Sequence, residues 1–185
     1  MKSSRLVTCA VVTAVNCILC TSAAFIMGAI PGLPLGFCPA IPVMIPFAIW
    51  FGGWGVLGAF IGCAIGGVLK GTAITVALPW VVNDIFMTGI PLLAFRILKA
   101  NPMLETKRDW TIFIAFGLVI NSVLACAWGT MIPVYFNVWP SGAVPMIYIQ
   151  YLIMALILIG TLVPLILKKF TPHVQRMGLM VEGYL

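Results

Sequence analysis

Asp84 is the only acidic residue inside any apolar segment of the sequence, and it closes the run Trp80-Val81-Val82-Asn83-Asp84. A carboxylate near the centre of a bilayer costs about 2.5–3.5 kcal/mol on insertion scales, and such groups face protein or trapped water rather than lipid. Something must compensate for this charge if the segment crosses a membrane. A bound ligand, a proton and a neighbouring helix are the three alternatives.

The composition indicates an integral membrane protein. Of the 185 residues, 63% are hydrophobic and only 8% are charged, which is too little charge to cover the surface of a soluble domain. No polar stretch is long enough to form a second domain, so we expect a single transmembrane domain over residues 1–185. The net charge of +6 does not indicate nucleic-acid binding, because the basic residues lie at the ends of apolar segments, where they set topology.

We predict an all-α bundle of six transmembrane helices with both termini in the cytoplasm. The second span is broken by three prolines and is barely long enough to cross, so a re-entrant segment is the alternative there. Six spans place nine of the ten Lys and Arg residues inside and Lys70 alone outside, as the positive-inside rule favours. The approximate spans are 6–29, 37–51, 54–69, 72–98, 110–131 and 144–167.

Two of these spans carry features that predict local structure. Gly58, Gly62 and Gly66 recur at four-residue spacing, which lets neighbouring helices approach closely and predicts a central position for the third helix. Pro79 and Pro91 each remove a backbone hydrogen bond from the fourth helix. They predict a kink or an unwound stretch with free carbonyl groups beside the Asp84 run.

Several polar and aromatic side chains fall at a common depth in the predicted topology. A concave, mostly apolar site with a few amide groups suits a small organic ligand. Lys70, the one outer charge, either extends to the membrane interface or meets an anionic group of the ligand. The candidate substrate-binding residues are Trp80, Asn83, Asp84, Asn121, Trp128, Gln150 and Lys70.

The two outer loops, residues 30–36 and 133–143, have no charged residues. Uncharged loops of this kind are expected to fold over the protein rather than extend into water. They are therefore candidates for a gate above the ligand, with Pro31, Gly32, Pro34, Tyr135, Asn137 and Trp139 as the gating residues.

Catalytic chemistry is not indicated. Metal-assisted hydrolysis needs a cluster of His, Asp or Glu, and nucleophilic catalysis needs a base beside the nucleophile. His173 is the only histidine and lies in the basic tail, while Cys17 and Cys20 are most simply packing residues. We therefore expect no enzyme activity, no metal site and no cofactor. The Walker A pattern is also missing, so any ATP hydrolysis must come from a partner.

The chain resembles the substrate-binding S component of energy-coupling factor (ECF) transporters in its size, six spans, apolar outer loops and the pair Ala10-x-x-x-Ala14. The resemblance implies uptake of a vitamin or similar micronutrient across a prokaryotic cell membrane. It implies that Ala10 and Ala14 dock a transmembrane coupling subunit, which works with two ATPase subunits, and that residues 30–37 form the gate. The metal-specific branch of the family is disfavoured, because its histidine-bearing amino terminus has no counterpart here.

Two other classes of protein remain open from the sequence. One is a small membrane scaffold of the rod-shape MreD type, in which Asp84 pairs only with internal groups. The other is a self-sufficient proton-coupled carrier, in which Asp84 is the proton site.

Overall fold

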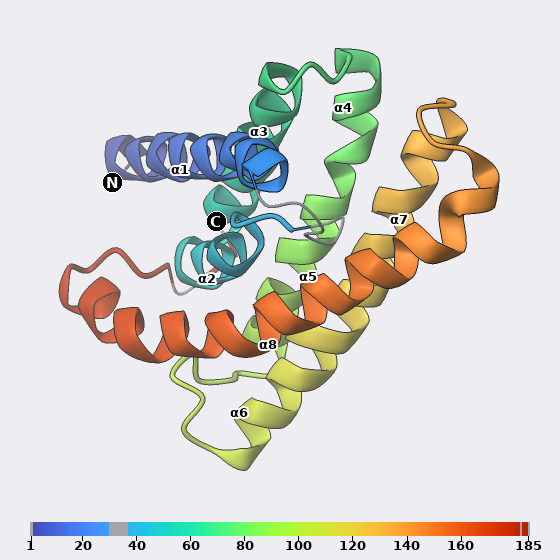
Figure 1. The fold of residues 1–185 in the computed structure, drawn as a ribbon. Coiled ribbons are helices and arrows are strands. Elements are labelled where there is room, and N and C mark those ends of the chain that lie inside the picture. Colours follow the sequence, from blue (N-terminus) through green and yellow to red (C-terminus); the bar gives the residue numbers. More distant parts are fainter. Residues whose placement is uncertain (1, 30–36, 182, 185) are drawn as a thin grey trace.

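The structure is a computed structural model that describes residues 2–29, 37–181, 183 and 184, and every regular element in these residues is helical. This confirms the predicted all-α class. Figure 1 shows the helices packed as a bundle. The elements in chain order are α1 (Lys2–Ala29), α2 (Ile41–Phe51), α3 (Gly53–Leu69), α4 (Ile74–Trp80), α5 (Val82–Ile97), α6 (Lys107–Ile112), the π-helix η1 (Phe113–Ile120), α7 (Asn121–Tyr135), the 3₁₀-helix η2 (Ser141–Ala143) and α8 (Val144–Arg176).

Among the described residues, four segments are long and apolar enough to cross a membrane, as in a multi-pass membrane protein. They are Arg5–Ile26, Ile74–Ile97, Lys107–Tyr135 and Ser141–Arg176. Helices α2 and α3 have 11 and 17 residues, and a perpendicular span of the hydrocarbon core needs about 20. The count of six spans and the cytoplasmic position of the termini therefore stay predictions.

The glycines of α3 lie at a close helix contact, as predicted, while Leu57, Ile61 and Ile65 on its other side are exposed. Helix α3 packs against α1, α2, α4 and α5, with the most extensive contact to α1. A Cβ atom built on Gly62 would lie 2.4 Å from the carbonyl oxygen of Thr13, and one on Gly58 would lie 2.7 Å from Cγ1 of Val12. The glycine face of α3 thus lies directly against the backbone of α1.

The fourth predicted span is interrupted where the prolines suggested. Helix α4 contains Pro79 and ends at Trp80, and α5 begins at Val82 after a break at Val81. The second proline, Pro91, lies inside α5 without ending it. The indole nitrogen of Trp128 on α7 donates a hydrogen bond of 2.8 Å to the Pro79 carbonyl oxygen, so a side chain satisfies an acceptor at the break.

The C-terminal residues fold back onto the turn between α2 and α3 (Figure 1). The backbone nitrogen of Val181 donates to the carbonyl of Trp50 at 2.8 Å, and that of Gly53 donates to the carbonyl of Tyr184 at 2.6 Å. The turn residue Gly52 has φ +64°, and a Cβ atom there would lie 2.8 Å from the Tyr184 oxygen. Only glycine fits this turn without strain.

The charged loop before α6 is held by a capping box. The hydroxyl of Thr106 accepts a hydrogen bond from the backbone nitrogen of Asp109 at 3.2 Å, and the Asp109 carboxylate accepts one from the backbone nitrogen of Thr106 at 3.0 Å. The same carboxylate also accepts bonds from the Thr106 hydroxyl at 2.7 Å and from the backbone nitrogen of Asn101 at 2.9 Å. This pattern fixes the start of the helical segment that continues through η1 into α7.

Candidate functional site

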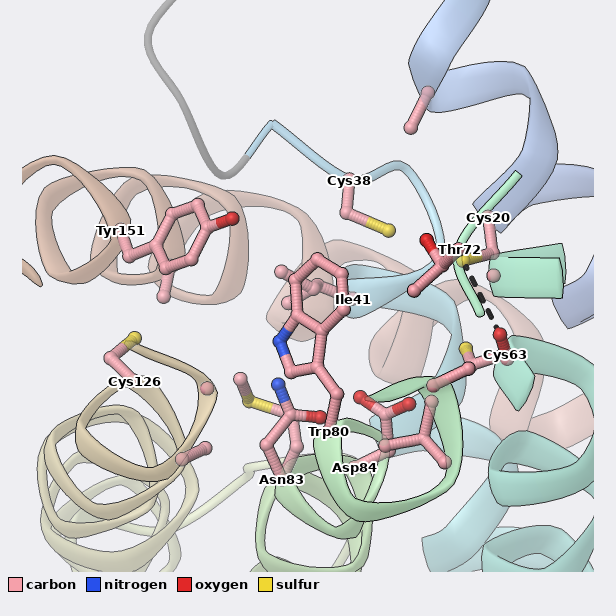
Figure 2. Close-up of a pocket in the computed structure, with 18 of the residues that line it drawn as sticks. Cys20, Cys38, Ile41, Cys63, Thr72, Trp80, Asn83, Asp84, Cys126 and Tyr151 are labelled. Carbon is pink, nitrogen blue, oxygen red and sulfur yellow. Dashed lines mark hydrogen bonds between the residues drawn. The ribbon is translucent and has the colours of Figure 1, made fainter. Parts of the chain in front are cut away.

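A cavity of about 360 Å³ lies between the helices, a volume within the range of small-molecule sites. Helices α1, α2, α3, α4, α5, α7 and α8 all contribute to its wall, which is mainly apolar and aromatic (Figure 2). The lining residues are Cys20, Ala23, Ala24, Phe37, Cys38, Ile41, Met44, Cys63, Gly67, Lys70, Thr72, Ala77, Trp80, Val81, Asn83, Asp84, Met87, Ala125, Cys126, Gly129, Trp139, Tyr151 and Ala155.

The break between α4 and α5 positions the central group of side chains. Trp80 ends α4, and Asn83 and Asp84 lie in the first turn of α5. Figure 2 shows the Trp80 ring and the Asp84 carboxylate beside the same open space. Asp84 is only 9% exposed. Gly129 on α7 leaves room for this group, because a Cβ atom there would lie 2.8 Å from the Asn83 amide nitrogen.

Three aromatic rings form one wall of the cavity. The ring of Trp139 lies between those of Trp80 and Tyr151, with centroid separations of 5.8 Å and 5.9 Å and edge-to-face geometry in both pairs. Trp80 ends α4, Trp139 precedes η2, and Tyr151 belongs to α8. Edge-to-face contacts of this kind are favourable, so the wall ties three segments together.

Cysteine side chains and one lysine form another part of the cavity. The ammonium group of Lys70 donates to Sγ of Cys20 at 3.3 Å, and Sγ of Cys20 lies 3.9 Å from the carbonyl oxygen of Cys63. Cys38 lines the cavity on the same side (Figure 2). The described residues hold no group of three or more His, Cys, Asp or Glu side chains suited to a metal ion.

Five of the predicted site residues come together around the cavity: Lys70, Trp80, Asn83, Asp84 and Trp139. The first four were predicted as ligand contacts and Trp139 as a gating residue. Trp139 forms part of the cavity wall, where its ring contacts those of Trp80 and Tyr151.

Three predicted ligand contacts lie outside the cavity lining. Asn121 is fully buried, and its amide donates to the Gly117 carbonyl at 3.1 Å. Trp128 is 36% exposed, and its indole nitrogen donates a hydrogen bond to the Pro79 carbonyl. Its side chain therefore stabilises the break between α4 and α5 and does not face the cavity. Gln150 is partly buried on α8 and also lies outside the lining.

The remaining predicted residues divide between the surface and the part of the chain that the structure does not describe. Tyr135 and Asn137 are exposed and line no part of the cavity. Ala10 and Ala14 are both exposed on α1. Pro31, Gly32 and Pro34 lie outside the described residues.

The cavity also contains cysteines and Tyr151, which were not among the predicted site residues, although Tyr151 has the same predicted depth as Gln150. Cys20, Cys38, Cys63 and Cys126 have the small, weakly polar side chains of ordinary packing residues, so no pattern distinguished them. Tyr151 follows Gln150, and consecutive residues on a helix point about 100° apart. Choosing Gln150 at the right depth therefore selected a different face of α8 from the one that meets the cavity.

Comparison with known proteins adds no match: no family model, curated protein or solved structure is similar to this chain. The cavity is therefore the feature of the molecule that indicates a function. Its wall offers one carboxylate, one ammonium group, one side-chain amide and four aromatic side chains among apolar groups. An apolar cavity with a few converging polar groups is the form of a site that binds a small molecule.

Proposed function

We propose that the protein is a membrane-embedded substrate-capture subunit for uptake of a vitamin or similar small organic micronutrient. The convergence of Lys70, Trp80, Asn83, Asp84 and Trp139 on one cavity carries the proposal. Four of these side chains come from residues 70–84, and Trp139 comes from the distant segment before η2. The proposal includes six spans, cytoplasmic termini and a prokaryotic cell membrane.

The exposed side of α1 supports a docking role. Thr13 and Asn16 of α1 lie against the glycines of α3, whereas Ala10 and Ala14 are exposed. Two small residues one turn apart allow another helix to approach closely. We propose that a transmembrane coupling subunit binds here and links the protein to two ATPase subunits.

The position of Asp84 favours one alternative over the other. A scaffold needs no cavity beside its membrane carboxylate, whereas a proton-coupled carrier would place such a carboxylate beside its substrate. Asp84 lines the cavity, so the self-sufficient carrier is the second candidate function.

Reconstitution of the purified protein into proteoliposomes distinguishes the capture subunit from the carrier and the scaffold. Purified protein in proteoliposomes is expected to bind a component of a mixture of tritium-labelled B vitamins without accumulating it in the lumen, with or without a pH gradient. Binding saturates at one ligand per protein. The ligand does not accumulate, because no energy source acts on the site. Accumulation that follows an imposed pH gradient would establish the carrier, and the absence of any binding would favour the scaffold.

A further inference from the structure

We propose that the ligand carries a positive charge, held between the carboxylate of Asp84 and the aromatic wall of Trp80, Trp139 and Tyr151. This inference rests on the proposed function and narrows its substrate to the class of small organic cations, protonated amines and quaternary ammonium compounds.

The first observation is that the Asp84 carboxylate forms no salt bridge within the described residues, although Lys70 of the same cavity interacts with it at longer range. Its carboxylate lies at the cavity and interacts with the thiol of Cys63, which is a weak hydrogen-bond donor. Lys70 lines the same cavity, but its ammonium group donates to Sγ of Cys20 instead. A carboxylate that is 9% exposed among apolar groups therefore has Lys70 nearby but lacks the direct ion pair that stabilises a buried charge.

The second observation is the chemistry of the wall beside Asp84. Ring faces of tryptophan and tyrosine attract cations within about 6 Å, and more strongly where water is excluded. Trp80 is four residues before Asp84, and both side chains line the cavity (Figure 2). Trp139 and Tyr151 extend the aromatic surface away from it. A carboxylate and aromatic faces both favour positive charge and both disfavour an anion.

The remaining lining sets the size and the apolar contacts of the ligand. Met44, Met87 and Ala125 offer apolar contacts for an uncharged body. Lys70 and Asp84 both adjoin the part of the cavity formed by Cys20 and Cys63, so the Lys70 ammonium group competes with a cationic ligand for the Asp84 carboxylate. The cavity volume of about 360 Å³ limits the ligand to a small molecule.

Two water-soluble probes of similar shape and opposite charge test the inference. Quenching of tryptophan fluorescence in the purified protein is measured with benzyltrimethylammonium and with benzylsulfonate, each up to millimolar concentration. We expect the cation to bind at least about tenfold more tightly than the anion, because it pairs with Asp84 and contacts the aromatic wall.

Substitutions test whether the preference for the cationic probe arises in the cavity. Asp84→Asn keeps the shape of the side chain and is expected to weaken cation binding by at least about tenfold. Glu105→Gln removes the same charge from an exposed position in the loop before α6 and is expected to leave cation binding unchanged. Lys70→Met is expected to strengthen it, because the substitution removes a positive charge near Asp84. If Asp84→Asn fails to give a monodisperse protein, Trp139→Leu provides the test, with the same direction of effect.

Equal binding of the two probes, preference for benzylsulfonate or no measurable binding of the cation would each overturn the inference. So would equal losses in Asp84→Asn and Glu105→Gln. Failure of the charge assignment can be distinguished from failure of the proposed function. A neutral vitamin that co-purifies and remains bound in Asp84→Asn would remove the charge assignment while leaving the capture function in place.

Discussion

Replacing Ala14 by leucine is expected to abolish uptake in cells and to leave ligand binding by the purified protein unchanged. Ala14 and Ala10 are exposed, while other residues of α1 lie against the glycines of α3. A leucine there adds bulk where a partner helix must approach closely, without entering the contact between α1 and α3. The loss of uptake should be complete, because a capture subunit that does not dock cannot release its ligand inward.

Uptake is measured in cells that contain the coupling and ATPase subunits, and binding is measured on protein purified from the same cells. Ala73→Leu is the matched control, since Ala73 is an exposed alanine outside α1. It is expected to retain uptake. A parallel fall of binding and uptake in Ala14→Leu would show that the substitution damages the fold, and the docking assignment would then be wrong.

Gly62→Ala is expected to destabilise the fold by about 3 kcal/mol, near the upper end of the usual range for overpacking. The added Cβ atom would lie 2.4 Å from the Thr13 carbonyl oxygen and 2.9 Å from Cβ of Asn16. Backbone atoms cannot move away individually, so α1 must separate from α3. The effect should appear as a lower midpoint of thermal unfolding in detergent.

Gly89→Ala is the control, because a Cβ atom on this α5 residue meets nothing within 4 Å. Alanine stabilises a helix by roughly 0.5–1 kcal/mol relative to glycine, so this variant should unfold at the same or a slightly higher temperature. Equal destabilisation by the two substitutions would mean that the glycine face of α3 does not hold α1.

The sequence predicted the helical class, the glycine contact of α3 and the interruption after Pro79, because each depends on local chemistry. It also predicted that Asp84 needs a special environment, since a lone carboxylate in an apolar segment has few alternatives. The site was predicted less well. Asn121 and Gln150 have a suitable depth, but the rotation of a helix about its axis depends on packing with its neighbours, and depth alone does not determine it.

Trp128 illustrates a different difficulty. An outer-half tryptophan suits a ligand wall, but its indole nitrogen is bound to the Pro79 carbonyl beside the helix break. That acceptor becomes visible only when the break and the position of α7 are known. Trp139 shows the converse case, because a loop residue predicted to gate the site contributes to the aromatic wall itself.

Native mass spectrometry of gently extracted protein from cells grown in rich medium tests the central claim most directly. The account predicts a bound species with the mass of a vitamin or similar micronutrient, retained in Glu105→Gln and lost in Trp139→Ala. Ligand-free protein that shows no mass shift with any member of a panel of vitamins would contradict the capture function.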